Sequence, residues 1–241
     1  MTPELSLPIQ TAWLIPLYGF IGMLVSLPWA CGWFRRDAHR PAAYLNILLT
    51  LLAFLHGSLI LQEVYQSGPV DLSFPWLSVA DLELNISFSL SLTNLVALEL
   101  ITGLSFLSQV YSLGYMDKEW ALARFFALLG FFEGAMSGVV LSDSLFQSYF
   151  LLEMLTLSTY LLVGFWYAQP LVVTAARDAF LTKRVGDVLL LMGVVALCSY
   201  SGVMGFNDLY AWAAQDTLSP LAATLLGCLL YTSDAADDWS S

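Results

Sequence analysis

Charged residues are scarce in this chain: they make up 11% of its 241 residues, whereas soluble domains carry about 25%. Hydrophobic residues make up 59% and gather in repeated runs. Several runs reach the length of about 20 mostly apolar residues that crosses a bilayer, which excludes a soluble domain with a single anchor. The first run has no basic stretch before it and no small-residue cleavage site, so it is a membrane helix and not a signal peptide. We therefore expect an all-α polytopic membrane protein.

Cysteines are few, and the residue patterns that hold cofactors are missing from the sequence. Cys31, Cys198 and Cys228 are scattered, without metal or redox spacing, which is typical of small apolar packing residues. The sequence has no glycine-rich phosphate loop, no cluster of metal ligands and no nucleophile–base pair. We therefore expect no cofactor, no metal and no redox chemistry in this chain. The net charge of −11 comes mostly from acids in loops and in the last residues, and it indicates neither a basic ligand nor nucleic acid.

The apolar runs predict about six complete transmembrane helices and the start of a seventh. The expected helices are Thr11 to Trp33, Ala43 to Val64, Leu90 to Leu113, Phe125 to Leu141, Leu145 to Tyr167 and Val172 to Tyr200, with the seventh opening at Pro220. Between the second and third helices, residues 66–89 contain glycine and proline and alternate apolar with polar residues in places. That pattern indicates an extramembrane β-hairpin or extended loop. Residues 201–220 are expected outside the membrane, with a short amphipathic helix.

The basic residues all fall on one side of this arrangement. They follow the first and third helices, or lie between the fifth and sixth helices and just inside the sixth: Arg35, Arg36, Arg40, Lys118, Arg124, Arg177, Lys183 and Arg184. Because basic loops stay in the cytoplasm or its equivalent, the N-terminus is expected on the lumenal or periplasmic side.

The last residues differ abruptly from the rest of the chain. Residues 1–230 are interpreted as the N-terminal part of a longer transmembrane domain, because a helix that stops inside the bilayer at Leu230 would leave its last carbonyls without partners. Residues 231–241, YTSDAADDWSS, resemble translated sequencing-adapter sequence and are expected to be a non-native tail.

Three charged residues within apolar runs are the main candidates for function. Glu153 lies near the middle of its run, where burial favours the neutral carboxyl group unless a cation is close. Arg184 and Asp187 are three residues apart, on one helix face and within ion-pair reach. A charge at mid-membrane costs at least ~2.5–3.5 kcal/mol, so such residues usually pair or line a polar path. The pattern predicts proton transfer, with a protonated, hydrogen-bonded Glu153 and a static Arg184–Asp187 pair as the structural alternatives.

Other polar residues in the apolar runs are weaker candidates. Glu99 and Glu133 are intramembrane acids that fit a polar path or a subunit contact, and Lys183 fits proton transfer or an ammonium group that reaches the interface. His56 is interpreted as a hydrogen-bonded packing residue.

Residues Leu122 to Leu191 carry a resemblance to a known family. This segment contains, in order, RFFA, the intramembrane glutamate Glu153, YLLVGFWY and RVGD. In these motifs and their order it resembles the NuoL/NdhF-type antiporter-like subunit of type I NAD(P)H dehydrogenase (complex I). The resemblance implies that Glu153 is a proton-channel residue and that Arg184 and Asp187 form a gating ion pair. It further implies a partner lysine just past Leu230. Quinone, iron–sulfur clusters and the electron donor are expected in partner subunits.

Two departures from that family's pattern narrow the resemblance. The chain has Ser91 to Asn94 where many members have Asp-Gly-Leu-Ser, and Glu133 where an apolar residue is usual. With the surrounding loops, these departures are most similar to the cyanobacterial F subunit of the variant complex linked to carbon dioxide uptake. The resemblance then implies a thylakoid or bacterial inner membrane, and other membrane subunits as partners. It also implies a carbonic-anhydrase-like partner near Arg35, Arg36 and Arg40 and the loop Asp117 to Glu119. A multi-subunit sodium/proton antiporter subunit and a non-pumping scaffold remain the alternatives.

Overall fold

The computed structural model describes residues 6–33, 40–79, 82–119, 121–214, 224 and 227. The chain forms two compact units, Met1–Ser142 and Asp143–Ser241, and each is described by itself. The expected seventh helix and the tail lie outside the described residues, as do Arg35 and Arg36.

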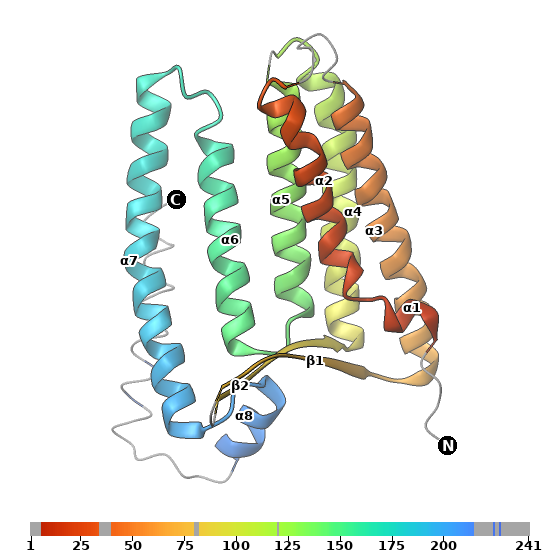
Figure 1. Cartoon of the computed structure of the whole chain (residues 1–241), viewed down its shortest axis with the longest axis vertical. Coiled ribbons are helices and arrows are strands. Elements are labelled where there is room, and N and C mark those ends of the chain that lie inside the picture. The colour runs from red at the N-terminus through yellow and green to blue at the C-terminus, as the bar shows by residue number, and fades with distance from the viewer. Residues whose placement is uncertain are drawn as a thin grey trace. The chain divides into compact units, whose positions relative to one another are not determined.

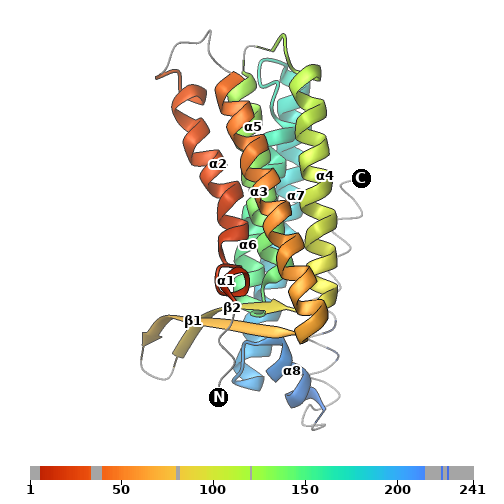
Figure 2. The ribbon, with the colours of Figure 1, turned by 90° about the vertical axis from the view of Figure 1, so that its right-hand side faces the viewer.

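The first unit is a bundle of helices that lie side by side (Figures 1 and 2). Its helices are α1 (Leu7–Gln10), α2 (Leu14–Ala30), α3 (Arg40–Ser67), α4 (Leu92–Tyr115) and α5 (Leu122–Leu141). The start of α4 is fixed by Ser91, whose Oγ accepts a hydrogen bond from the Asn94 backbone N–H at 3.2 Å. Such a cap satisfies one of the free N–H groups of the first turn.

The predicted first helix, Thr11 to Trp33, corresponds to α2 but begins three residues early, because a turn over residues 11–13 separates α2 from the short helix α1. Pro16 has no N–H to donate to the carbonyl of Ala12, so this proline is tolerated only in the first turn of a new helix. The break places α1 across the end of the bundle (Figure 2).

Glycines bring α2 and α5 into close contact. A Cβ atom on Gly19 would lie 2.5 Å from the backbone N of Gly134 and 2.6 Å from the carbonyl O of Gly130. Small residues at such positions let two helix backbones approach closely, which is how membrane helices commonly associate.

A β-hairpin lies at one end of the bundle (Figure 2). It confirms the hairpin predicted from the alternation of apolar and polar residues. Strands β1 (Val70–Val79) and β2 (Leu82–Leu90) pair antiparallel from Val70 opposite Leu90, with an irregularity between Pro75 and Leu77. Proline cannot donate to the strand ladder, which explains the position of this irregularity. Buried Phe88 and Leu90 join Ile9 and Val64 in the core beneath the hairpin.

In the second unit, residues 143–214 form two long helices and a short one. The long helices are α6 (Leu145–Val163) and α7 (Pro170–Ser201), which run antiparallel, followed by α8 (Phe206–Ala213) (Figure 1). Gly202, with φ of 71°, ends α7 in the left-handed conformation that glycine adopts without strain. The Leu145 N–H then donates to the Met204 carbonyl at 2.9 Å, which joins the beginning of α6 to the segment after α7. The predicted short amphipathic helix is confirmed as α8.

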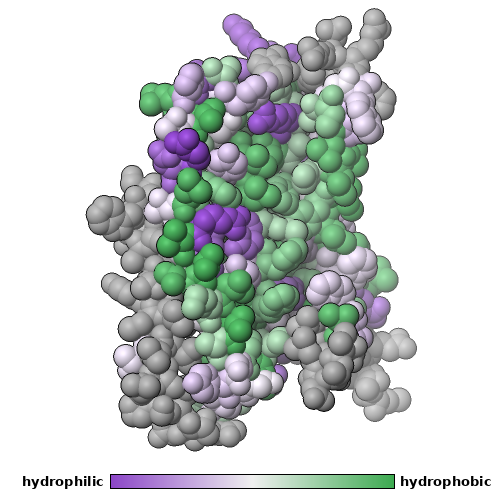
Figure 3. All heavy atoms as spheres, turned by 60° about the vertical axis from the view of Figure 1, so that its left-hand side comes forward, coloured by the Kyte–Doolittle hydropathy of each residue, from purple (hydrophilic) through white to green (hydrophobic). Residues whose placement is uncertain are grey.

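The helices are those of an integral membrane protein. Among the described residues, α3, α4, α5 and α6 are long and apolar enough to cross a membrane, and α2 is a shorter apolar helix. The count of six spans stays a prediction. On α4, Leu100, Leu104 and Leu107 are each about 60% exposed (62%, 59% and 63%) and form an outward apolar stripe. Figure 3 shows a face on which hydrophobic residues form a broad band, interrupted by small hydrophilic patches.

Candidate functional site

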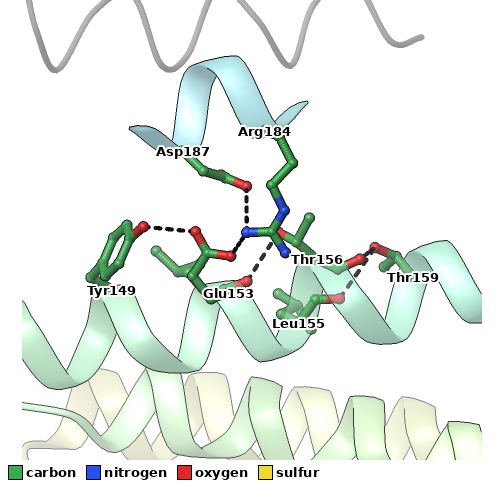
Figure 4. A network of polar contacts seen from close by, with 8 residues as sticks. Tyr149, Glu153, Leu155, Thr156, Thr159, Arg184 and Asp187 are labelled. Atoms are coloured by element: carbon green, nitrogen blue, oxygen red, sulfur yellow. Dashed lines mark hydrogen bonds and ion pairs between the residues drawn. The ribbon is translucent and has the colours of Figure 1, made fainter. Parts of the chain in front are cut away.

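The antiparallel pairing of α6 and α7 brings together charged residues that lie 31 positions apart in the sequence. Glu153 comes from the middle of α6, and Arg184 and Asp187 come from the middle of α7. In Figure 4 the three side chains converge between the two helices.

Arg184 is shared between two carboxylates. Its Nη1 atom donates to Glu153 Oε2 and lies 3.7 Å from Asp187 Oδ2. The other oxygen of Glu153, Oε1, accepts from the hydroxyl of Tyr149 at 2.8 Å. The exposed fractions of the side chains are 35% for Arg184, 20% for Glu153 and 16% for Asp187. The cluster is therefore partly buried, and its charges are only partly screened.

Aromatic rings hold the guanidinium group in place. The Arg184 Cζ atom lies 4.6 Å from the centre of the Phe180 ring, one helical turn earlier on α7. The Phe180 ring packs against Tyr160 of α6, with 4.7 Å between ring centres. A cation over an aromatic face is attracted by the ring quadrupole, so this stack favours a position of Arg184 toward α6.

The arrangement has one cation for two acids, and this ratio determines its chemistry. A carboxylate in a medium of low dielectric constant stays ionised when a cation lies against it and favours the neutral form when the cation leaves. Movement of Arg184 toward Asp187 would therefore raise the proton affinity of Glu153, and its return would lower it. Tyr149 can donate to Glu153 in both states, but this hydrogen bond is stronger while Glu153 is ionised.

Sequence reasoning anticipated part of this cluster. The structure places Arg184 and Asp187 on one face of α7, within reach of each other, as their spacing suggested. The direct ion pair between Arg184 and Glu153 was not predicted, because the register between α6 and α7 is not visible in either apolar run. Tyr149 was not predicted either, although a tyrosine four residues before Glu153 lies on the same helix face and could have been found from that spacing.

The weaker candidates lie elsewhere. Glu133 and Glu99 belong to the first unit, where each accepts from a hydroxyl of α3: Glu133 Oε2 from Thr50 at 2.5 Å, and Glu99 Oε2 from Ser58 at 3.0 Å. Lys183 is half-buried on α7, beside Arg184 in sequence. Roles of Glu133, Glu99 and Lys183 in proton transfer stay predictions.

Two other sequence candidates have local partners. His56 Nε2 lies 3.2 Å from both Thr11 Oγ1 and the Pro8 carbonyl, in agreement with a hydrogen-bonded packing residue. Arg40, the described member of the first basic cluster, pairs with Asp117 at 2.6 Å. In the described part of the chain, no three His, Cys, Asp or Glu side chains gather in a way that could hold a metal ion.

Two family models match the chain. Residues 76–126 match the model described as NADH-ubiquinone oxidoreductase (complex I), chain 5 N-terminus. Residues 142–233, which include the whole Glu153–Arg184–Asp187 cluster, match the model described as NADH:quinone oxidoreductase/Mrp antiporter, TM.

Curated relatives carry the name of one subunit. The chain is 74% identical over 232 residues to NAD(P)H-quinone oxidoreductase subunit 5, organellar chromatophore 2, of Paulinella chromatophora, covering 95% of this chain and 38% of that protein. It is 32% identical to the chloroplastic NAD(P)H-quinone oxidoreductase subunit 5 of Agrostis stolonifera, covering 92% of this chain and 31% of that protein. The chain thus spans less than two fifths of the length of these relatives.

Solved structures share the fold. The Mrp complex from Dietzia superposes with a TM-score of 0.72 at 20% identity, covering 94% of this chain and 23% of that one. The membrane-bound sulfane sulfur reductase, an archaeal respiratory membrane complex, gives a TM-score of 0.78 at 17% identity, covering 93% and 44%. The chain therefore shares its fold with chains of these two membrane complexes. The sequence matches show that the chain belongs to the NuoL/NdhF-type family of complex I chain 5.

Proposed function

We propose that this chain is the part of a proton-translocating membrane subunit that carries the Glu153–Arg184–Asp187 cluster, in a type I NAD(P)H or ferredoxin:plastoquinone oxidoreductase. The electron donor, iron–sulfur clusters and quinone belong to partner subunits. The names of the curated relatives support the complex. The observation that carries the proposal is the position of Arg184 between two carboxylates on facing helices.

Proton transfer follows from the competition for Arg184. While the guanidinium group lies on Glu153, that carboxyl group is ionised. When quinone reduction in the partner subunits shifts Arg184 toward Asp187, Glu153 takes up a proton. The return of Arg184 expels this proton toward the next acceptor, which the family resemblance predicts to be a lysine past Leu230. Lys183 and Glu99 are secondary candidates in this path.

The test is the substitution Glu153→Gln in the assembled complex. Glutamine keeps the shape and the hydrogen bond from Tyr149, but it carries no exchangeable carboxyl proton. We expect proton uptake into membrane vesicles to fall at least ~10-fold, which corresponds to about 1.4 kcal/mol in the transfer barrier, while the complex still assembles. Glu63→Gln, at the far end of α3, is the matched control and should pump normally. Normal pumping by an assembled Glu153→Gln complex would remove the basis of the proposal.

A second candidate function is ion exchange in a multi-subunit sodium/proton antiporter. The fold of the Dietzia Mrp complex and the Mrp name in the second family model favour it. Sodium transport that depends on Glu153 and needs no electron donor would support this alternative. Full pumping in a Glu153→Gln complex that assembles would instead leave the chain as a scaffold.

We also propose a photosynthetic setting for the complex, in the thylakoid or bacterial inner membrane, with the N-terminus on the lumenal or periplasmic side. The chloroplastic relatives support it. This proposal includes the carbon dioxide uptake variant of the complex. In that variant a carbonic-anhydrase-like partner would bind on the opposite face, near Arg35, Arg36, Arg40 and the loop Asp117 to Glu119. The Arg40–Asp117 ion pair supports it, because it joins the two loop regions at one end of the first unit.

A further inference from the structure

A second acid is buried more deeply than Glu153. Glu133, in the middle of α5, is only 1% exposed and lies inside the first unit. Its Oε2 atom accepts from Thr50 Oγ1 of α3 at 2.5 Å and from Gln109 Nε2 of α4 at 3.4 Å. Gln109 Nε2 also donates to Thr50 Oγ1 at 2.8 Å. Thr50 and Gln109 are equally buried, at 2% and 0% exposed, so three helices close around one carboxyl group.

The hydrogen bonds of this cluster are incomplete. Glu133 Oε1 and Gln109 Oε1 are buried and have no hydrogen-bond partner in the described part of the chain. An ionised carboxylate offers about four acceptor positions over its two oxygens. Here the donors reach one oxygen only, which leaves a full carboxylate charge poorly compensated.

Among the residues that the structure describes, no counter-charge lies at the level of Glu133. The elements packed against α5 are α2, α3, α4 and β2. The titratable and charged residues of these elements and of α5 itself are Tyr18, Arg40, Tyr44, His56, Glu63, Tyr65, Glu83, Glu99, Tyr111, Tyr115 and Arg124. Among the described residues, no basic side chain contacts Glu133.

The nearest basic groups are displaced along their helices. At 1.5 Å per residue, Arg40 is about 15 Å and His56 about 9 Å from Thr50 along α3, and Arg124 is about 14 Å from Glu133 along α5. Arg40 moreover pairs with Asp117, and Tyr111, two residues from Gln109, is 71% exposed. A charged Glu133 would therefore be a buried carboxylate without a cation, which is strongly unfavourable.

We propose that Glu133, Thr50 and Gln109 form a second proton-binding site, in which Glu133 holds a proton as a neutral carboxylic acid. In this site Oε2 accepts from Thr50 Oγ1 and from Gln109 Nε2, and the proton lies on Oε1, the oxygen that no donor reaches.

The test is infrared spectroscopy of the assembled complex, with wild type and Glu133→Gln compared before and after exchange into heavy water. The substitution should remove one carbonyl band of a protonated carboxylic acid that shifts on exchange. Thr50→Val should shift this band without removing it, because the hydrogen bond is lost and the proton stays. Asp71→Asn removes an exposed carboxylate on β1 of the same unit and should leave the band unchanged.

Three results would contradict the proposal that Glu133 binds a proton. Loss of an ionised carboxylate band in Glu133→Gln would show that Glu133 is charged. Sodium-dependent changes in that carboxylate band would indicate a cation site in place of a proton site. Failure of Glu133→Gln to assemble would also count against it, because a pocket for a neutral acid should accept the neutral amide. None of these readouts depends on pumping through Glu153, so this site and the proposed function stand or fall separately.

Discussion

Arg184 is the residue whose removal has the sharpest predicted consequence. The substitution Arg184→Met keeps an unbranched stem against Phe180 but leaves Glu153 and Asp187 without the cation they share. Breaking a fully buried ion pair costs about 3–5 kcal/mol. Because the Arg184 side chain is 35% exposed, we expect a smaller loss, of about 1–3 kcal/mol in the free energy of unfolding.

The origin of this loss can be tested with a double-mutant cycle, measured by denaturant titration in detergent micelles. The double variant Arg184→Met with Glu153→Gln also removes the carboxylate to which Arg184 donates. The two losses should therefore not add, and the coupling should be about 1–2 kcal/mol. Arg177→Met is the control, since Arg177 and Asp178 on the same helix are both 61% exposed and such surface pairs contribute about 0–1 kcal/mol.

Additive losses in the cycle would mean that Arg184 and Glu153 do not stabilise each other. Equal effects of Arg184→Met and Arg177→Met would mean that the pair contributes no more than an exposed ion pair. In the proposed mechanism Arg184 expels the proton from Glu153, so the pumping rate of the Arg184→Met complex should fall together with its stability.

Two further predictions address the hydrogen bond to Glu153 and the packing of the first unit. Tyr149→Phe removes only the hydroxyl that donates to Glu153, so the complex should still assemble. Its pumping rate should fall ~3- to 10-fold, which corresponds to the loss of a hydrogen bond of about 0.5–1.5 kcal/mol. An unchanged rate in the vesicle assay would show that Tyr149 plays no part in proton transfer. Gly134→Ala should destabilise the first unit by about 1–3 kcal/mol in thermal unfolding, because the new Cβ atom would lie 2.9 Å from the Pro16 carbonyl O and 3.0 Å from the Phe20 backbone N. Gly114→Ala on α4 meets open space and should stabilise slightly, and equal effects of the two substitutions would contradict the close packing of α2 and α5.

Much of the fold could be predicted from the sequence because the membrane imposes a simple rule: apolar runs become helices and polar segments lie outside. The hairpin was visible from the alternation in residues 66–89, and α8 from the polar segment after α7. The short helix α1 was not predicted, since its four residues lie before the expected first helix and are too few to show a periodic pattern. The predicted fifth helix was four residues too long, because α6 ends at Val163 before Phe165 and Trp166.

The site could be predicted only as a set of residues and not as a set of contacts. Glu153, Arg184 and Asp187 stand out because each is charged within an apolar run. Which carboxylate receives Arg184 depends on the register of α6 against α7, which is set by the packing of rings such as Tyr160 and Phe180. The partners of Glu133 likewise could not be predicted from the sequence. Thr50 and Gln109 are 83 and 24 positions away from it, and neither residue type is unusual in a membrane helix.

We propose that Glu153 carries protons driven by quinone reduction elsewhere in the complex. The most direct test is the number of protons translocated per electron, measured in vesicles that hold the Glu153→Gln complex, with proton uptake and electron flow to quinone recorded together. We expect electron flow to continue while the ratio of protons to electrons falls below that of the wild type. An unchanged ratio would contradict it.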